Sequence, residues 1–293
     1  MICAEPASQK RACGRTRAGR AALAAKRARS ARALLAECRF CAHNCGANRL
    51  AGETGPCHAG AEARFFSAQT EVSDEIALIP AFAVALSGCD MRCDFCITGA
   101  ASWNPRAGLT FPPKEMAAKA RAAMRHGART IMVLGGEPTI HLPAVMEFVS
   151  YLPDTPRLIW KTNAHGSAQA RELLDGIFDI WVADFKFGND ACALRLAKTR
   201  DYVRIVRENL LWAHAHSELI VRHLVMPGHV ECCWQPVAEW LAENLPGVKV
   251  NLRTGFWPAW QAGRHSELRG ALTASGREFA FEVAHHFGLN LIS

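Results

Sequence analysis

Three closely spaced cysteines, Cys89, Cys93 and Cys96, follow the apolar run at residues 82–86 with the spacing C-x3-C-x2-C. An iron–sulfur cluster of four irons normally takes four thiolates, so three thiolates would leave one iron open to another molecule. Zinc also accepts clustered thiolates, but a structural zinc site is closed by four ligands, typically with a second pair downstream. The spacing therefore favours an iron–sulfur cluster over zinc, and its open iron would be a place for chemistry.

A glycine pair follows a second apolar run, residues 130–134, in the order Gly135, Gly136, Glu137, Pro138. Residues without a Cβ atom let a ligand approach the backbone closely. The carboxylate of Glu137 can accept hydrogen bonds from an ammonium group. The segment therefore predicts a site for a ligand that carries an amine.

A second cysteine set lies nearer the amino end of the chain. It comprises Cys38, Cys41, Cys45 and Cys57. Four thiolates close a metal site, as structural zinc prefers, yet a low-potential iron–sulfur cluster uses four thiolates equally well. The sequence predicts metal binding here and leaves zinc and iron–sulfur open, while thiols that lie close by accident are a third reading.

The other cysteines are Cys3, Cys13, Cys192, Cys232 and Cys233. We expect them to be small buried or incidental residues without a role. Of twelve cysteines, seven are grouped in the two sets and no secretory leader is expected, which indicates metal ligation in a reducing compartment rather than a disulfide framework. We therefore expect a cytoplasmic protein.

The composition fits a folded protein with a large core, since the chain has 293 residues and is 50% hydrophobic. No apolar stretch reaches the roughly 18 residues of a membrane span, so a soluble protein is expected. Residues 1–37 hold nine Lys or Arg and two Glu, which accounts for the whole net charge of +7. The rest of the chain is neutral, which argues against nucleic-acid binding. An exposed basic helix is expected at about residues 19–37.

From residue 82 onward, short apolar runs alternate with helical stretches, which predicts βαβ units and a parallel sheet. The expected strands are residues 82–87, 130–134, 157–162, 178–185, 219–225 and 248–253. The expected helices are residues 114–126, 142–151, 167–174, 202–214, 236–243 and 274–287. A doubly wound sheet is the alternative architecture.

In βα barrels the active-site groups lie at the carboxyl ends of the strands. Asp184 and Lys186 lie two residues apart at such an end, so their side chains face the same side. A buried charged pair is costly unless it is partnered. A structural ion pair at the barrel mouth remains the alternative to a functional one.

Two further strand ends carry polar residues. Asn163 has amide groups suited to a ribose hydroxyl or a carboxylate, although it could simply begin a loop before His165. Arg222 and His223 alternate across a strand, so only one of them can point into a barrel. A structural role is the commoner outcome for His223.

The ordered pair of motifs, C-x3-C-x2-C and then Gly-Gly-Glu-Pro, resembles the radical S-adenosylmethionine (SAM) superfamily. The resemblance implies a partial (β/α)6 barrel and a [4Fe-4S] cluster on Cys89, Cys93 and Cys96 whose open iron chelates the amino and carboxylate groups of SAM. It also implies that Gly135, Gly136 and Glu137 receive the methionine amine. Asn163 and Arg222 are expected as further cofactor contacts.

The cysteine-rich segment before such a core is similar to the PflX-type group, related to pyruvate formate-lyase activating enzymes, over roughly residues 33–290. Those enzymes carry an Asp-x-Lys at the strand end where Asp184 and Lys186 stand, near the cofactor and the incoming peptide. Ile97 and Thr98 replace the Gln-Asn usual in that group, which puts the substrate in doubt. The resemblance implies an electron donor such as flavodoxin or ferredoxin.

The predicted activity is reductive cleavage of SAM to a 5′-deoxyadenosyl radical that abstracts hydrogen from a substrate, which could be a glycyl-radical enzyme. Modification of a small metabolite or a peptide uses the same core. A non-catalytic iron–sulfur or zinc protein for binding or electron transfer is the hypothesis from another class. We expect three parts: a basic helical extension at residues 1–37, a four-cysteine segment at 38–75 and the partial barrel at 76–293.

Overall fold

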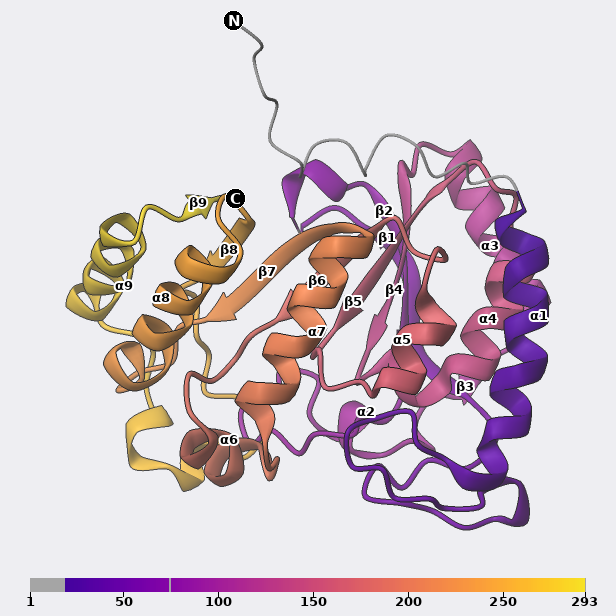
Figure 1. Ribbon diagram of the computed structural model, residues 1–293, viewed down its shortest axis with the longest axis horizontal. Helices are drawn as coiled ribbons and strands as arrows, with labels where there is room; N and C mark the ends of the chain where they lie inside the picture. The colour runs from indigo at the N-terminus through magenta and orange to yellow at the C-terminus, as the bar shows by residue number, and fades with distance from the viewer. Residues whose placement is uncertain (1–18, 74, 293) are drawn as a thin grey trace, which may run out of the picture.

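A curved sheet of nine strands forms the centre of the computed structural model, which describes residues 19–73 and 75–292 (Figure 1). The strand order is β3-β1-β2-β4-β5-β6-β7-β8-β9. The strands are β1 Arg64–Glu71, β2 Ala81–Leu86, β3 Leu109–Thr110, β4 Thr130–Gly135, β5 Arg157–Thr162, β6 Ile180–Asp184, β7 Glu218–Leu224, β8 Lys249–Arg253 and β9 Asn290–Leu291.

The seven strands from β2 to β9, leaving out β3, are parallel and follow one another in chain order. The strands β1 and β3 extend one edge in antiparallel pairing. The sheet is not closed, so the predicted partial barrel is confirmed and the doubly wound alternative is wrong. All six predicted strands are present, whereas β1, β3 and β9 were not predicted.

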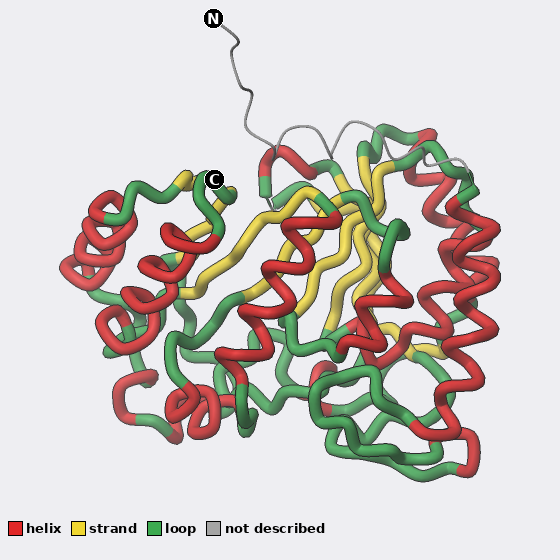
Figure 2. The backbone as a smooth tube through the Cα atoms, in the orientation of Figure 1, coloured by secondary structure: helices red, strands yellow, loops and turns green. Residues whose placement is uncertain are grey.

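The helices of the described residues are α1 Arg20–Ala33, α2 Ala100–Trp103, α3 Pro113–Arg125, α4 Leu142–Ser150, α5 Ala168–Leu174, α6 Asp190–Ala197, α7 Tyr202–His216, α8 Gln235–Asn244 and α9 Ala274–His286. The longer ones pack against the outer face of the curved sheet, whereas α2 and α6 lie at one end of it, as Figure 1 shows; Figure 2 shows the same arrangement by secondary structure. The six helices predicted for the barrel are confirmed. The short helix α6, which follows β6, was not predicted.

Two apolar cores lie on the two faces of the sheet because side chains alternate along a strand. The outer core contains large residues such as Trp160 and Trp181, which meet the helices. The inner core is smaller and contains Leu78, Ala81, Ala83, Met132, Ile159, Ile180, Val182 and Ile220. On this inner face, the residues nearer the carboxyl ends of the strands are charged, and they define the candidate site below.

Helix α1 packs against α4, so the prediction of an exposed basic helix is wrong for one of its faces. Ala24 and Ala31 are fully buried, and small side chains allow this close approach. Arg20 is buried as well and pairs with Asp179, with 3.0 Å between Nη1 and Oδ2. The expected basic extension also includes residues 1–18, which lie outside the described residues.

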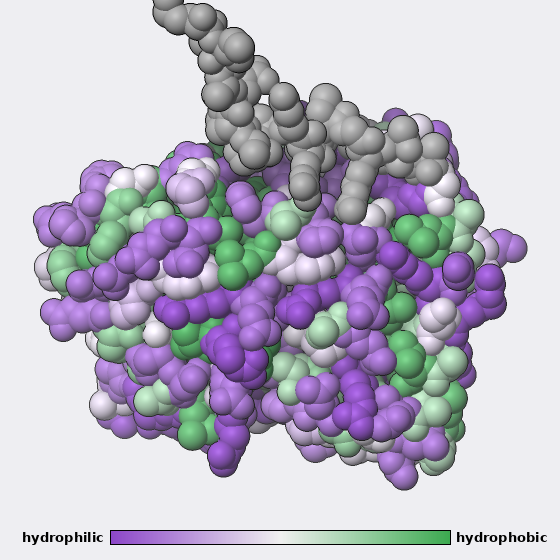
Figure 3. Space-filling model, viewed as in Figure 1, coloured by the Kyte–Doolittle hydropathy of each residue, from purple (hydrophilic) through white to green (hydrophobic). Residues whose placement is uncertain are grey.

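The surface seen in Figure 3 is mostly hydrophilic, with smaller apolar patches scattered among the polar residues. Among the described residues, no helix is both long enough and apolar enough to span a bilayer.

Candidate active site

The cysteines of the C-x3-C-x2-C motif lie in the loop that follows β2, at the carboxyl edge of the parallel strands. Cys89 is buried, while Cys93 and Cys96 are half-buried. Burial is the main cause that raises the pKa of the Cys93 thiol to about 12 and the pKa of the Cys89 thiol well above its ordinary value. The thiolate forms therefore require a bound cation, as metal ligation would provide.

Hydrogen-bond donors surround two of these sulfur atoms. The backbone amide of Met91 lies 3.4 Å from Cys89 Sγ, and Asn163 Nδ2 lies 3.7 Å from the same atom. The hydroxyl of Thr98 lies 3.2 Å from Cys96 Sγ. Donors of this kind stabilise metal-bound thiolates and tune the potential of a cluster. The residues present therefore fit an iron–sulfur cluster held by this trio.

The glycine pair at the end of β4 lies against the backbone of the cluster loop. A Cβ atom on Gly136 would be 1.9 Å from the carbonyl oxygen of Gly88, and one on Gly135 would be 2.2 Å from backbone atoms of Leu86. Gly135 also has φ of +138°, a value that L side chains rarely adopt. The missing side chains thus permit β4 to meet the cluster loop at this point.

The carboxylate of Glu137 is buried in a set of hydrogen bonds. Its Oε1 accepts from the amide and hydroxyl of Thr139 and from the hydroxyl of Thr162 at 2.8 Å, and its Oε2 accepts from the amide of Asn163 at 2.7 Å. Burial first, and then the nearby Asp90, raise the pKa of Glu137 to about 7. A carboxylate has about four acceptor positions, so Oε2 can still receive one further donor.

The side chain of Asn163 forms hydrogen bonds with other groups of the protein. Its Nδ2 donates to Asp90 Oδ1 at 2.7 Å and approaches Cys89, while its Oδ1 accepts from the amide of His165 at 2.9 Å. The other oxygen of Asp90 lies 2.7 Å from His165 Nδ1. His43 of the cysteine-rich segment completes this group, with Nε2 2.9 Å from the Asp90 carbonyl. This arrangement favours a positioning role for Asn163 beside the trio.

Asp184 and Lys186 form an ion pair inside the barrel, and Arg222 Nε lies 3.2 Å from Asp184 Oδ1. Burial alone would raise the pKa of the Asp184 carboxyl, but the two cations hold that pKa below its ordinary value. Burial lowers the pKa of Lys186, and Asp184 and Cys93 more than offset it, so that this pKa is raised. The pair is therefore charged at neutral pH and lies within electrostatic reach of the cysteine trio.

A second acid, Glu75, was not predicted from the sequence, since it stands alone in a loop. It is fully buried, and its carboxylate lies 3.4 Å from Lys161 Nζ and 3.6 Å from Arg222 Nη1. The Nδ2 of Asn251 donates to it at 3.2 Å. Among the described residues, Glu75, Lys161 and Arg222 form a charged cluster with Asp184 and Lys186 on the inner face.

Of the two neighbours Arg222 and His223, which point to opposite faces of the strand, Arg222 therefore points into the barrel. His223 points outward, and its Nδ1 lies 2.6 Å from the carbonyl oxygen of Phe185, while its ring centroid lies 4.8 Å from that of Trp234 with the two rings tilted by 36°. Burial lowers the pKa of His223 to about 4. The structural role expected for this histidine is confirmed.

The four-cysteine segment lies beside the same carboxyl edge, pairing at Cys41 with Gly166 after β5. Cys38, Cys41 and Cys57 are buried, whereas Cys45 is exposed. The guanidinium of Arg49 is buried among them, with Nη1 3.6 Å from Cys38 Sγ. Burial is the main cause that raises the pKa values of the Cys41 and Cys57 thiols.

Cys192, Cys232 and Cys233, for which no role was expected, lie around His229 with all four potential ligand atoms within 4.8 Å of one another. The sequence pattern that could have identified this group is His229-x2-Cys232-Cys233, because this spacing places three potential ligands within about one helical turn.

A curved, mostly parallel sheet with a three-cysteine loop after its first parallel strand is the architecture typical of radical SAM enzymes. The family model of the radical SAM superfamily matches residues 84–241, more than half of the chain. An uncharacterized protein of Methanocaldococcus jannaschii, MJ0674, is 31% identical over 272 residues, which cover 89% of this chain and 78% of that protein. The chain belongs to the radical SAM superfamily.

Two solved structures of Streptococcus suis SuiB share the fold. The SAM-bound form has a TM-score of 0.54 at 16% identity and covers 69% of this chain and 47% of SuiB. The form bound to the precursor peptide SuiA has a TM-score of 0.53 at the same identity and covers 69% of this chain and 46% of SuiB. The chain thus spans about half the length of SuiB. The superfamily implies a [4Fe-4S] cluster, SAM and radical chemistry.

Proposed function

We propose that this protein is an enzyme that uses Cys89, Cys93 and Cys96 to hold a [4Fe-4S] cluster and that abstracts hydrogen from a peptide or protein. The bound cluster and SAM would supply a 5′-deoxyadenosyl radical after one-electron reduction. The observation that carries the proposal is the cysteine trio at the edge of a charged barrel interior. An electron donor such as flavodoxin or ferredoxin is required.

The chain's own residues would orient SAM from two sides. On one side, the Oε2 atom of Glu137 has an acceptor position left for the methionine amine, and the backbone of Gly135 and Gly136 borders the same place. On the other side, Lys186 and Arg222 place an ammonium and a guanidinium group beside Asp184. These cationic groups suit a carboxylate, either of SAM or of the substrate.

The proposed peptide or protein substrate is supported by apolar residues near the trio. Ile97 directly follows Cys96 and is 78% exposed, and Trp257 is 71% exposed. Trp260 packs on Trp103 with 5.8 Å between ring centroids, and the amide of the next residue, Gln261, donates to the carbonyl of Asp94 in the cluster loop. Exposed aromatic groups at a site entrance suit a peptide chain. Activation of a glycyl-radical enzyme, as in the PflX-type group, is the narrower form of this proposal.

A small carboxylate-bearing metabolite is the second candidate substrate. The cations of the inner cluster are half-buried, so they would be reached by a small anionic molecule more readily than by a folded chain.

We further propose that Cys38, Cys41, Cys45 and Cys57 hold a second metal centre. The buried guanidinium beside Cys38 suits a site with net negative charge. An iron–sulfur centre there, with Cys45 at the surface, would offer an entry point for electrons; zinc is the alternative, and separate counts of iron and zinc distinguish them.

The test is an anaerobic assay of reconstituted protein with SAM and a strong reductant. We expect 5′-deoxyadenosine and methionine from the unchanged chain, background levels from Cys93→Ala and full activity from Arg106→Ala, which alters an exposed residue of the following loop. Intact SAM with a fully loaded cluster would refute the proposal. Substrates deuterated at Cα identify the class: deuterium in 5′-deoxyadenosine from peptides supports the first candidate, and deuterium only from small carboxylic acids supports the second.

A further inference from the structure

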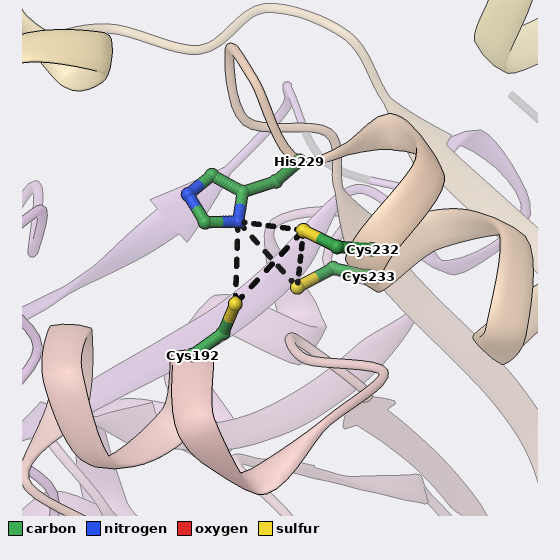
Figure 4. Close-up of side chains that lie close together, drawn as sticks. All are labelled: Cys192, His229, Cys232 and Cys233. Atoms are coloured by element: carbon green, nitrogen blue, oxygen red, sulfur yellow. Dashed lines mark hydrogen bonds between the residues drawn. The ribbon is translucent and has the colours of Figure 1, made fainter.

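Four potential metal ligands converge outside the candidate active site, as Figure 4 shows. Cys192 comes from α6, which follows β6. His229, Cys232 and Cys233 come from the turn after β7. Because β6 and β7 are neighbours in the sheet, the segments that follow them meet at the same edge.

The distances match a single tetrahedral ion. With a metal–sulfur bond of about 2.3 Å and a metal–nitrogen bond of about 2.05 Å, a tetrahedron places two sulfurs roughly 3.8 Å apart and a sulfur and a nitrogen roughly 3.5 Å apart. The Sγ atom of Cys232 lies 3.9 Å from that of Cys192 and 3.8 Å from that of Cys233. The Nδ1 atom of His229 lies 3.6, 3.3 and 3.6 Å from Cys192, Cys232 and Cys233.

The backbone has the irregular form that brings these groups together. Residues Val230–Trp234 form one turn of π-helix before α8, a conformation that is rare and frequent at functional sites. On the opposite side, Gly188 lies so close that a Cβ atom there would be 2.5 Å from the carbonyl oxygen of Cys233. The loop after β6 is thereby held against the turn that carries three of the ligands.

The surroundings suit an ion with three thiolates and one imidazole, which has a net charge of −1 when the ion is divalent. Arg195 supplies a cation, with Nη2 3.3 Å from His229 Nε2, and it pairs with Glu267. The Glu267 carboxylate lies 3.6 Å from the same Nε2 atom. Metal-bound histidines generally direct their second ring nitrogen to such a carboxylate.

We propose that Cys192, His229, Cys232 and Cys233 bind one structural zinc ion that fastens α6 to the turn after β7. Four protein ligands close the site, as in structural zinc centres. A four-iron cluster is disfavoured because its thiolates bind different irons and do not converge on one point. The ion would fix the segments that follow the strands of Asp184 and Arg222. The proposal does not depend on the proposed enzymatic activity.

The test counts zinc and iron in anaerobically purified full-length protein by mass spectrometry. Cys192→Ala and Cys232→Ala should each lose one equivalent of zinc per chain while keeping the iron of the unchanged protein. Glu231→Gln, which alters an exposed residue in the same turn, should keep both. Cys89→Ala should lose iron and keep this zinc.

His229→Cys addresses the possibility that the variants only disturb folding. It replaces nitrogen by sulfur, so it should retain the zinc that His229→Ala loses. Cobalt(II) added to zinc-depleted protein should give the charge-transfer and visible bands of tetrahedral cobalt–thiolate coordination, weakened by Cys192→Ala and unchanged by Glu231→Gln. Equal zinc in all variants, iron in place of zinc at these four residues, or a Cys192–Cys232 disulfide in the purified protein would each overturn the proposal.

Discussion

Glu75 offers the sharpest test of how the barrel interior is stabilised. Its fully buried carboxylate lies 3.4 Å from Lys161 and 3.6 Å from Arg222. At an effective dielectric constant of about 20, each pair attracts by roughly 5 kcal/mol before desolvation. Glu75→Gln would remove an acid that faces Lys161 and Arg222, so the net charge of the cluster would become more positive by one unit.

The expected loss of stability follows from measured cases. Removal of one partner from a buried ion pair costs about 3–5 kcal/mol, because the remaining charge stays buried without compensation. At an unfolding entropy of about 2.1 cal/mol/K per residue, a chain of 293 residues changes its Tm by roughly 1.6 °C per kcal/mol, so we expect Glu75→Gln to lower Tm by roughly 5–8 °C. Differential scanning calorimetry of the metal-loaded protein measures this shift.

Two controls make the result specific. Glu62→Gln alters an exposed acid and should leave Tm nearly unchanged. Adding Lys161→Met to Glu75→Gln restores the net charge that the cluster has in the unchanged protein and should recover part of the lost stability. The proposed stabilisation of the cluster is refuted if Glu75→Gln lowers Tm no more than Glu62→Gln does. It is also refuted if the loss of stability in the double variant equals the sum of the losses in Glu75→Gln and Lys161→Met measured singly.

Three further outcomes are expected. His223 has a pKa lowered to about 4 by burial, so its contribution to stability is present above the unfolded value of about 6.5 and is lost as pH falls toward 4; His223→Gln should flatten that part of the pH dependence of the free energy of unfolding, measured by urea titration. Gly136→Ala would place Cβ 1.9 Å from the Gly88 carbonyl, so iron retention should fall while Gly263→Ala, at an open position, retains it. Thr98→Val removes a hydroxyl 3.2 Å from Cys96 Sγ, so redox titration should show a lower cluster potential at unchanged Tm.

Much of the parallel sheet could be predicted because each of its six longer strands is a short apolar run between turn signals and helices. The strand β1, Arg64–Glu71, was not predicted because its residues are mixed in polarity and form no continuous apolar run. It belongs to the antiparallel part at one edge of the sheet. The two-residue strands β3 and β9 are too short to leave a pattern. The short helix α6 was not predicted, although its buried residues Ala193, Leu196 and Ala197 recur at helical spacing.

Site residues with a local sequence pattern could be predicted, whereas those that approach from distant parts of the chain could not. Cys89, Cys93 and Cys96 could be predicted because their spacing is local. The partners that satisfy Asp184 and Arg222 could not, because Glu75 reaches them from a loop before β2 and its own neighbours in sequence are ordinary.

The proposed zinc site shows how topology could supply what local spacing lacks. Cys192 lies forty residues from Cys232, so no motif of ordinary length contains both. Once β6 and β7 are assigned as adjacent parallel strands, the segments that follow them must meet at one edge. Cys192 lies eight residues beyond the end of β6, and His229 five residues beyond the end of β7. A search for ligand types across the segments after adjacent strands would therefore pair them, because the sheet order alone brings those segments together.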